Sequence, residues 1–472
     1  MFFISPLPAT LCAISAASLG YYLSKVNKRL IGPHSLDEVL SDEELAASRE
    51  SWRKIDMLKA IPSRCTCEGY VVIGGSGFVG SYIVQLLLLR KETSIRIIDA
   101  NPPAAAVLSN PSVSFVKVDI TSRQALREAL QAPFALTGKP ANVVYHTAAV
   151  IRFWERAEYC KDATWAVNVE GTRNVLEIVK ELPGQPILVY TSTADLCLAE
   201  PDSWFSLRRS ATKVPVYSDN TSPGSFHESR MYTRSKYAAE QLVIAADKAS
   251  TSVKHGIIRP GYAIVGLNDP MIHQLIRSGP QVPFFDGGWA STAVAVWDVA
   301  AAHLLMEDAL RERPQEVRAD PFLVTGKCEP WSYAKMRNTL KILCEPPLEL
   351  VALPPLAMLL TAHAVEIMLW TRYHSLATVF AILRMKHKPA LVPKWLGQTR
   401  NLQPAMMTYM REFILDDSRA RKVLGYVSLC FYVLFPRHSP HLLGTDLNGL
   451  LQRSYTKLSL SIDCKEELHC RA

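Results

Sequence analysis

The chain has ten cysteines but lacks any Cys-x-x-Cys pair and any cysteine and histidine cluster with zinc-site spacing. Its only close pair is Cys65-Thr-Cys67, so we expect reduced thiols in a cytosol-facing protein and no bound metal. It also lacks a block of lysine and arginine interleaved with aromatic residues, and we therefore expect no nucleic-acid partner. The modest net charge of +8 suits an anionic cofactor or an anionic membrane surface without specifying either.

Charged residues are also absent from the N-terminus, between Phe2 and Leu23, and residues 25–29 then contribute three basic side chains. An apolar run of about 20 residues is long enough to cross a bilayer. Because no positive charge precedes this run, it does not resemble a cleaved signal peptide. The basic residues that follow it place the rest of the chain in the cytosol by the positive-inside rule. We therefore expect residues 1–24 to form a single membrane anchor, with a buried N-terminal helix as the alternative.

What the chain does contain is an alternation of strand and helix patterns typical of an α/β fold. Residues 69–90 have the pattern of an apolar strand, a glycine-rich turn and an amphipathic helix. Further strands are predicted at 94–100, 113–120, 142–149, 187–196 and 256–266, with helices at 122–131, 162–182 and around 230–242. Such alternation predicts a Rossmann-type, doubly wound parallel sheet.

The remaining segments suggest a domain order around this sheet. Residues 25–67 are predicted to be a linker or peripheral helix, 68–266 the cofactor-binding domain, 267–426 a smaller C-terminal substrate lobe, and 427–472 a tail of unknown role. Within the lobe, the apolar stretch 347–370 is interrupted by Pro354, Pro355 and Glu366. We expect it to lie in a membrane interface or to pack on the lobe rather than to span a bilayer. Asn220 begins a glycosylation sequon that we expect to stay unmodified in a cytosolic domain.

A phosphate-binding turn is indicated where the first strand meets its helix. Gly74, Gly77 and Gly80 form Gly-x-x-Gly-x-x-Gly, with Phe78 and Val79 between the last two. Small residues at this point let the backbone approach a pyrophosphate, whose charge is then stabilised by the positive end of the helix. A glycine motif alone is weak evidence, but here it has the strand before it and the helix after it.

Two acidic residues at strand ends refine this prediction. Asp99 ends the second strand, where a carboxylate can accept hydrogen bonds from ribose hydroxyls and would repel a 2′-phosphate, so NAD is favoured over NADP. Asp119 ends the third strand and is either an adenine contact or a structural residue. The competing interpretation is a glycine-rich turn followed by a surface aspartate.

A candidate catalytic pair lies in 230-RMYTRSKYAAEQL-242, where Tyr232 and Lys236 are four residues apart on a predicted helix. Residues at this spacing share a helix face. An ammonium beside a phenol lowers the phenol pKa from near 10, and such a tyrosine can accept the proton of a substrate alcohol. Ser192 and Thr193, at the end of an earlier strand, are candidate donors to the substrate oxygen. Without the cofactor motif, the solvated face of an ordinary helix would be the better interpretation.

These motifs together resemble the extended short-chain dehydrogenases, over about residues 68–426. The resemblance rests on GGSGFVG at 74–80, Asp99, HTAA at 146–149, NVEGT at 168–172, YTST at 190–193, YTRSK at 232–236 and RPG at 259–261. The segments 146-HTAAVIRF-153, 297-WDVAAAHLL-305 and 322-FLVTGKCEPWSY-333 are similar to the branch of 3β-hydroxysteroid dehydrogenases and sterol-4α-carboxylate 3-dehydrogenases, and most of all to its fungal members. The segment after Leu424-Gly425-Tyr426 departs from the family pattern.

The resemblance implies a role for each matching residue. Tyr232 would be the acid/base and Lys236 its partner on the nicotinamide ribose. Thr193 stands at the usual serine of the family and keeps its hydroxyl, with Ser192 as the alternative donor. Ala148 would line the nicotinamide and Pro260 would lie beside its carboxamide. Asn168 would support the site, in a structural or a catalytic role.

The expected function is NAD-dependent oxidation of the 3β-hydroxyl of a sterol or triterpenoid, with loss of CO₂ if C4 bears a carboxylate. The alternatives are a 3β-hydroxysteroid dehydrogenase that also shifts a double bond, an epimerase of the same fold, and a membrane-tethered protein that binds NAD without turnover. The resemblance also implies a lipid-like substrate and attachment to the endoplasmic reticulum membrane. The sequence also allows a homodimer, although no feature of it indicates one.

Overall fold

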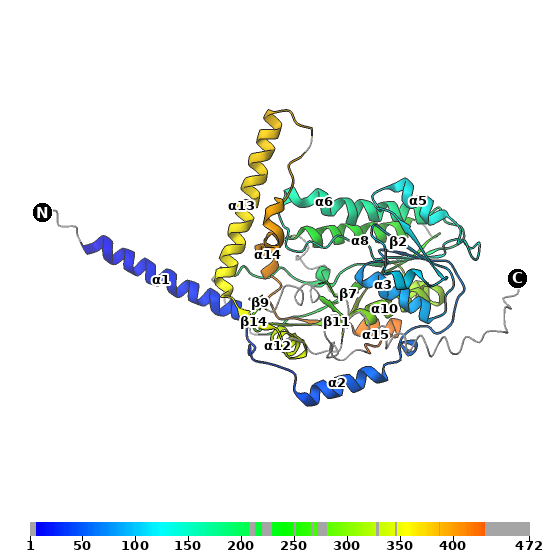
Figure 1. The fold of residues 1–472 in the computed structure, drawn as a ribbon, viewed down its shortest axis with the longest axis horizontal. Helices are drawn as coiled ribbons and strands as arrows, with labels where there is room; N and C mark the ends of the chain where they lie inside the picture. Colours follow the sequence, from blue (N-terminus) through cyan, green and yellow to red (C-terminus); the bar gives the residue numbers. More distant parts are fainter. Residues whose placement is uncertain are drawn as a thin grey trace.

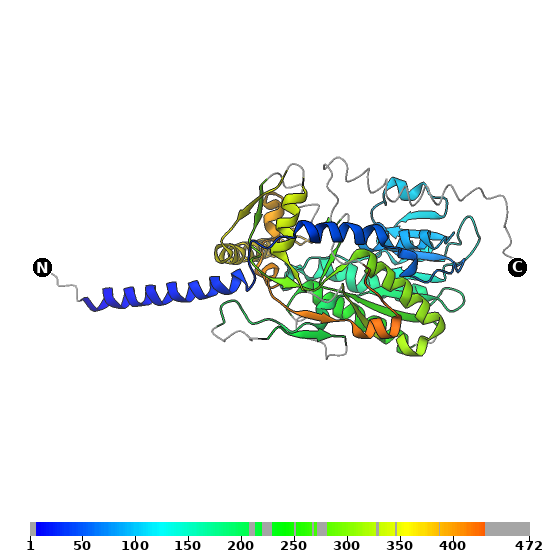
Figure 2. The ribbon, with the colours of Figure 1, turned by 90° about the horizontal axis from the view of Figure 1, so that it is seen from below.

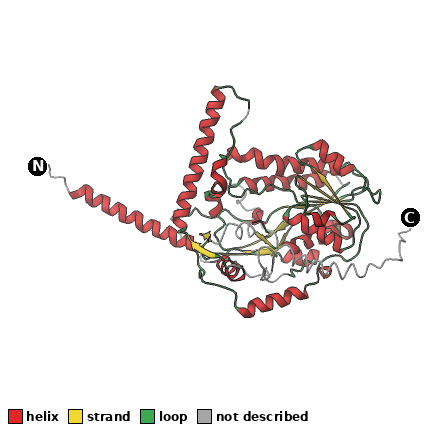
Figure 3. Ribbon diagram, in the orientation of Figure 1, coloured by secondary structure: helices red, strands yellow, loops and turns green. Residues whose placement is uncertain are grey.

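The computed structural model describes residues 6–206, 213–219, 229–249, 252–266, 269–270, 281–326, 330–344, 347–386 and 388–429. Figures 1 and 3 show a body of helices packed around strands, with two long helices extending away from it. The sequon at Asn220 and most of the 427–472 tail lie outside the described residues.

A seven-stranded parallel sheet forms the centre of the body. Its strands, in spatial order, are β12 (Pro321–Val324), β7 (Lys254–Pro260), β5 (Ile187–Thr191), β4 (Val143–His146), β1 (Tyr70–Ile73), β2 (Ile95–Asp99) and β3 (Val113–Lys117). Every neighbouring pair is parallel. The order reverses at β1, as it does in doubly wound folds, and the predicted fold class is confirmed.

Helices cover both faces of this sheet, which explains why its strands are apolar on both sides. α3 (Phe78–Leu89) and α10 (Val296–Glu312) pack on one face, where the core includes Leu86 and Leu304. α5 (Arg123–Gln131), α7 (Thr172–Val179) and α8 (Met231–Ala249) pack on the other, where the core includes Leu126, Val175 and Val243. The carboxyl ends of all seven strands therefore meet at one edge, between the two helix layers.

A strand overlaps each predicted range and the helix at 122–131 is present, but three features differ from expectation. The pattern at 256–266 is divided, because β7 ends at Pro260 and residues 263–265 form a short strand outside the main sheet. The sheet extends beyond residue 266, because β12 joins its edge from within the predicted substrate lobe. The predicted helix 162–182 is divided into α6 (Lys161–Trp165), a π-helical segment at Ala166–Gly171 and α7. Hydrophobic spacing did not reveal this π-helical turn, which is a local change in winding that often marks functional sites.

The rest of the lobe is built from short paired strands and small helices. The strand pairs are β10 (Ala290–Ser291) with β13 (Trp331–Ser332), β11 (Ala293–Ala295) with β8 (Ala263–Val265), β14 (Glu349–Ala352) with β9 (Gln281–Phe284), and β15 (Ile414–Asp416) with β6 (Val216–Ser218). The small helices of the lobe include α11 (Pro314–Val317), α12 (Tyr333–Leu343), α14 (Pro404–Met407) and α15 (Ser418–Leu424), and a further short helix, α4 (Ala105–Leu108), precedes β3. Short 3₁₀ helices lie at Met57–Lys59, Glu158–Cys160, Ala194–Cys197 and Lys394–Asn401.

Two long helices extend from one end of the body, α1 (Pro6–Ile31) and α13 (Pro355–Ile382). α1 projects away from the body in both views of Figures 1 and 2, whereas α2 (Asp42–Lys54) lies along the body. α1 and α13 meet at a small core that includes Val26, Leu30, Leu359 and Ala362. The stretch predicted at 347–370 thus becomes β14 followed by α13, a helix that begins at Pro355 and buries one stripe against its neighbours.

The predicted transmembrane anchor at residues 1–24 is not supported. Among the residues that the structure describes, no helix combines the length and hydropathy needed to cross a bilayer. In α1 the apolar residues are interspersed with serine, threonine, glycine and tyrosine, and the helix continues into Lys25, Lys28 and Arg29.

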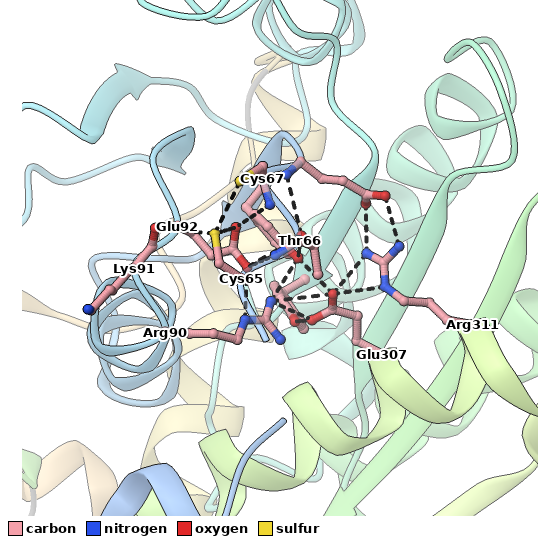
Figure 4. A network of polar contacts seen from close by, with 11 residues as sticks. Cys65, Thr66, Cys67, Arg90, Lys91, Glu92, Glu307 and Arg311 are labelled. Atoms are coloured by element: carbon pink, nitrogen blue, oxygen red, sulfur yellow. Dashed lines mark hydrogen bonds and ion pairs between the residues drawn. The ribbon is translucent and has the colours of Figure 1, made fainter. Parts of the chain in front are cut away.

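A buried polar network holds the amino-terminal edge of the sheet (Figure 4). Glu307 on α10 accepts hydrogen bonds from Tyr70 at 2.8 Å, Arg90 at 3.0 Å and Arg311 at 2.9 Å, and another from the Tyr145 hydroxyl. Glu92 extends the network by pairing with Arg90 at 2.9 Å. Because Glu307 is only 1% exposed, its charge is stabilised by these partners rather than by water.

The Cys65-Thr-Cys67 pair lies at the margin of the same network. Both thiols are free, with their Sγ atoms 3.4 Å apart. The backbone N–H of Cys67 donates to the Glu92 carboxylate at 3.1 Å. Burial raises the pKa of Cys65 to about 12, so this thiol is a poor nucleophile at neutral pH.

Candidate active site

The glycine-rich turn adopts a conformation that only small residues permit. Gly74 has a φ of +87°, and a Cβ there would lie 2.5 Å from the backbone nitrogen of Ala148. A Cβ on Gly80 would lie 2.2 Å from the Gly74 oxygen. Gly77 precedes the first turn of α3 and provides no side-chain cap, so the N–H groups of that turn are available to an anion. Phe78 and Val79, both half-buried, occupy this same turn.

Asp99 lies directly beside this turn. Its Oδ2 accepts a hydrogen bond from the Ser76 N–H at 3.1 Å, and its Oδ1 accepts one from the Asn101 N–H at 3.0 Å. Each carboxylate oxygen retains a second lone pair for a ribose hydroxyl. Asp119 instead makes local bonds to the backbone and hydroxyl of Thr121, at 2.9 and 2.8 Å. These bonds agree with the structural interpretation of Asp119.

The next two predicted cofactor residues also lie at the carboxyl edge of the sheet. The N–H of Ala148, just after β4, donates to Ile73 at 3.0 Å and brings the chain against the glycine turn. Pro260 ends β7 and pairs in register with Val324 of β12. Both therefore lie on the same edge as Gly74 and Asp99.

Tyr232 and Thr193 face each other at this edge. Tyr232 lies on α8, and Thr193 lies two residues after the end of β5. Both side chains are half-buried, and a hydrogen bond from Thr193 acts to lower the Tyr232 pKa. Burial and the nearby Asp195 charge outweigh that bond, so the pKa of Tyr232 lies above its ordinary value. At neutral pH Tyr232 is therefore a phenol that holds its proton.

Lys236 lies one turn further along α8, and its ammonium contacts residues of β5. Its ammonium donates to the backbone oxygen of Thr191 and lies 4.2 Å from the centroid of the Tyr190 ring. Burial lowers the pKa of Lys236 to about 7, a shift that the charge of Glu240 opposes. The expected lowering of the Tyr232 pKa by Lys236 is not found, because no contact between the described atoms joins the two groups.

The hydroxyls of Ser192 and Thr193 have different surroundings. The Ser192 hydroxyl is buried and donates to Glu240 at 2.6 Å. The Thr193 hydroxyl accepts a long bond of 3.3 Å from the Asp195 N–H and remains partly accessible. The geometry thus favours Thr193 as the hydroxyl that could reach a substrate.

Asn168 supports the site from the π-helical segment. Its amide nitrogen donates to the Ser235 hydroxyl at 2.8 Å and to Val150 at 3.0 Å, while its oxygen accepts from the Val150 N–H at 2.7 Å. With all of these bonds made, Asn168 joins the loop after β4 to α8. This geometry agrees with a structural role.

Two buried acids near the site were missed from the sequence. Burial raises the pKa of Asp195 to about 6, against the opposing charges of Arg230 and Arg411. Glu240 is fully buried on α8. Its position four residues after Lys236 was the one sequence signal that could have identified Glu240 as part of the site, since residues at this spacing lie on the same face of a helix.

Comparison with known proteins places this geometry in context. The model of the 3-beta hydroxysteroid dehydrogenase/isomerase family matches residues 71–343. The human sterol-4-alpha-carboxylate 3-dehydrogenase, decarboxylating, is 30% identical over 209 residues, which are 44% of this chain and 46% of that protein. The 3 beta-hydroxysteroid dehydrogenase/Delta 5-->4-isomerase of Monkeypox virus is 30% identical over 182 residues, 38% of this chain and 46% of that protein. The chain thus spans about half the length of these curated relatives.

Solved structures show the same fold at lower identity. The UDP-glucose-4-epimerase of Stenotrophomonas maltophila, solved with NAD, is 16% identical with a TM-score of 0.52 and covers 83% of this chain and 99% of its own. The UDP-glucose 4-epimerase of Thermotoga maritima is 18% identical with a TM-score of 0.51 and covers 77% and 96% respectively. Identities this low support the architecture alone.

Proposed function

The chain belongs to the 3-beta hydroxysteroid dehydrogenase/isomerase family, and from this membership we propose that it oxidises the 3β-hydroxyl of a sterol or triterpenoid to a ketone with NAD. The observation that carries the proposal is the arrangement of Tyr232 and Thr193 at the sheet edge that also holds the glycine turn. The human relatives named for sterol-4-alpha-carboxylate and 3 beta-hydroxysteroid dehydrogenation support the substrate class.

The residues at the glycine turn fit a dinucleotide. Without a Cβ at Gly74 and Gly80 the turn closes tightly, and the uncapped N–H groups at the start of α3 could bind a pyrophosphate. Asp99 would accept bonds from ribose hydroxyls, which favours NAD over NADP. When bound, NAD supplies a cationic ring that accepts the hydride from C3 of the substrate.

Two side chains of the protein would position the substrate hydroxyl and accept its proton in this reaction. Thr193 would donate a hydrogen bond to the substrate oxygen and hold it against Tyr232. The Tyr232 oxygen, once ionised, accepts the hydroxyl proton as the C3–H bond breaks and the C=O bond forms. Burial of Tyr232 raises its pKa, so the oxidation should become faster as pH rises.

We propose the decarboxylating form of this reaction for substrates with a carboxylate at C4. Once C3 is a ketone, the bond from C4 to the carboxylate can break, and its electron pair passes into the carbonyl as CO₂ leaves. Tyr232 then returns its proton to the resulting enolate. No oxidant beyond the dinucleotide is needed.

The test is absorbance at the NADH band with purified protein, given NAD or NADP and either a 3β-hydroxysterol or its 4-carboxy derivative. NADH formation with CO₂ release supports the decarboxylating dehydrogenase. Oxidation without CO₂ release leaves a plain 3β-dehydrogenase. NAD binding without turnover on any sterol contradicts the proposal and favours the non-catalytic NAD-binding alternative, and substrate turnover without net NADH favours an epimerase.

Thr193→Ala should lower kcat by about 10²-fold, because one preorganised donor to the reacting oxygen is lost. Ser192→Ala should lower kcat much less, since the Ser192 hydroxyl is occupied by Glu240. Thr193→Ser keeps the hydroxyl and serves as the control. Steady-state kinetics of the three variants distinguish the donors, and a larger loss in Ser192→Ala would reverse the assignment.

We also propose that α1 and α13 bind a lipid surface, which would bring the enzyme to an apolar substrate. On α13, Ile367 is 63%, Trp370 53% and Ile382 74% exposed. A cavity of about 500 Å³ lies between α13 and residues 156–159, and its lining combines Ile367 and Trp370 with the Arg156–Glu366 ion pair. Attachment to the endoplasmic reticulum stays a prediction.

Flotation with vesicles that contain anionic lipid tests this surface. The wild-type protein should float with the vesicles, and Ile367→Glu with Ile382→Glu should largely abolish flotation, because both charges would enter the bilayer interface. Leu136→Glu is the matched control, since Leu136 is equally exposed at 72% but lies away from α1 and α13. Equal flotation of all three proteins would contradict the proposal.

A further inference from the structure

A buried ion pair lies behind the candidate catalytic residues, between α8 and β7. Arg259 donates to Glu240 through Nε at 2.9 Å and through Nη2 at 2.5 Å. Glu240 is 0% and Arg259 6% exposed. A bidentate pair held out of water is expensive to bury, so its position beside the site calls for a reason beyond stability.

The same carboxylate connects to the strand that carries the hydroxyl donors. Glu240 Oε2 accepts the Ser192 hydroxyl at 2.6 Å as well as the Arg259 bond. The Ser192 N–H in turn donates to Ile258 of β7 at 2.7 Å. Glu240 therefore fixes the residue immediately before Thr193 and so limits where the Thr193 hydroxyl can lie.

Glu240 also lies one helical turn from Lys236, on the same side of α8. Lys236 is 3% exposed, so its ammonium depends on nearby protein groups rather than on water. The charge of Glu240 opposes the effect of burial on Lys236. Glu240 and Lys236 therefore form one electrostatic unit next to the candidate catalytic residues.

We propose that Glu240 is a positioning residue of this active site: it keeps Lys236 in its ammonium form and holds Ser192 so that Thr193 faces Tyr232. Arg259 moderates this effect by sharing the Glu240 charge. The functional consequence rests on the proposed dehydrogenase activity, but the protonation of Lys236 can be measured without turnover.

The other titratable groups around Lys236 come from every layer that packs against it. Tyr190 of β5 presents its ring to the ammonium. His146 of β4 feels the Lys236 charge, and burial lowers its pKa to about 3. His303 of α10 bonds to the Thr191 hydroxyl at 2.7 Å, and burial lowers its pKa to about 4. Both histidines are therefore neutral near pH 7.

Within this set Tyr232, on α8, is also uncharged, because its pKa is raised. Glu240 is thus the group whose charge opposes the effect of burial on Lys236, and Arg259 is bound to that same carboxylate. Removing either charge should shift that protonation, and the two shifts should have opposite signs.

The experiment follows the protonation of Lys236 by NMR of the full chain labelled with ¹³C at lysine Cε, with the signal assigned by its loss in Lys236→Arg. Glu240→Gln removes the negative charge, so the titration midpoint should fall by about one to three pH units. Arg259→Met leaves Lys236 as the cation that acts on Glu240 and should raise the midpoint. Glu240→Asp keeps the charge and should restore most of the wild-type value.

Glu307→Gln is the matched control, because Glu307 is also a fully buried carboxylate that pairs with arginine but lies at the opposite edge of the sheet. It should lower stability and leave the Lys236 midpoint unchanged. Unchanged midpoints in both Glu240→Gln and Arg259→Met would overturn the inference. If Glu240→Gln does not fold, the rise in Arg259→Met decides it alone.

The pH dependence of NADH formation then links this protonation to activity. Ionisation of Tyr232 makes activity rise with pH, and if the ammonium is required this rise should level off above the Lys236 midpoint. Activity of Glu240→Gln should therefore level off at a lower pH than that of the wild type. A wild-type protein inactive on every sterol would refute the proposed function, while the NMR titration would still decide the role of Glu240.

Discussion

Tyr232→Phe should lower kcat for sterol oxidation by about 10²–10⁴-fold, the usual contribution of a general acid/base. The phenylalanine ring keeps the packing of α8 and removes only the oxygen that accepts the proton. Binding of NADH should be nearly unchanged, because the glycine turn and Asp99 are intact. Steady-state kinetics with NAD, together with an NADH binding titration, measure both quantities.

Tyr237→Phe is the matched control for this variant. Tyr237 lies on the same helix and is half-buried. It directly follows Lys236, whereas Tyr232 precedes Lys236 by one helical turn. It should retain nearly full activity. A Tyr232→Phe protein that oxidises sterol at the wild-type rate would remove Tyr232 from the reaction.

Glu307→Gln should lower the free energy of unfolding by about 1–3 kcal/mol, because it removes the carboxylate that Arg90 and Arg311 share inside the protein. Arg90 keeps Glu92 as its charged partner, and Arg311 keeps Glu68. Arg90 is only 3% exposed and has little access to water. Denaturant titration followed by circular dichroism measures the loss. Glu316→Gln is the control, since Glu316 forms an exposed pair with Arg313, and such pairs contribute about 0–1 kcal/mol.

The stability lost in Glu307→Gln should also depend on pH. Burial acts to raise the pKa of Glu307, but Arg90 and Arg311 outweigh it and hold the pKa below its usual value. A lowered folded pKa contributes stability above the unfolded value and loses it as pH falls through the folded value. The difference between wild type and Glu307→Gln should therefore shrink on acidification, and a constant difference would contradict this account.

The sheet and the cofactor turn could be predicted because their signals are local. Gly74 and Gly80 stand where only glycine fits, and Asp99 ends a strand whose apolar pattern is plain from the sequence. The strand patterns beginning at 69 and continuing to Pro260 correspond to strands of the main sheet, whereas residues 263–265 form a strand that pairs outside it. In each case, neighbouring residues along the chain determine the structure.

The features that were missed depend on contacts between distant segments. Nothing in the sequence near Ser192 shows that Glu240, on a later helix, binds its hydroxyl. The choice between Ser192 and Thr193 as the donor to the substrate oxygen therefore stayed open until the fold was known. The direction of Lys236 depends on the backbone oxygen of Thr191, and the π-helical turn at 166–171 is a change of winding without a change of hydrophobic period. The anchor predicted at residues 1–24 rested on the absence of charge, whereas in the described part of the chain no helix combines the length and hydropathy needed to cross a bilayer.

The pairing of β7 with β12 has a consequence for synthesis of the chain. β7 ends at Pro260, whereas β12 begins at Pro321, so the ribosome must add the intervening residues while one side of β7 lacks its neighbour. At 5–20 residues per second this takes on the order of 10 s, during which an unpaired strand edge invites association with other chains. Nascent chains arrested before β12 should therefore recruit chaperones or aggregate, whereas chains arrested well beyond it should resist protease.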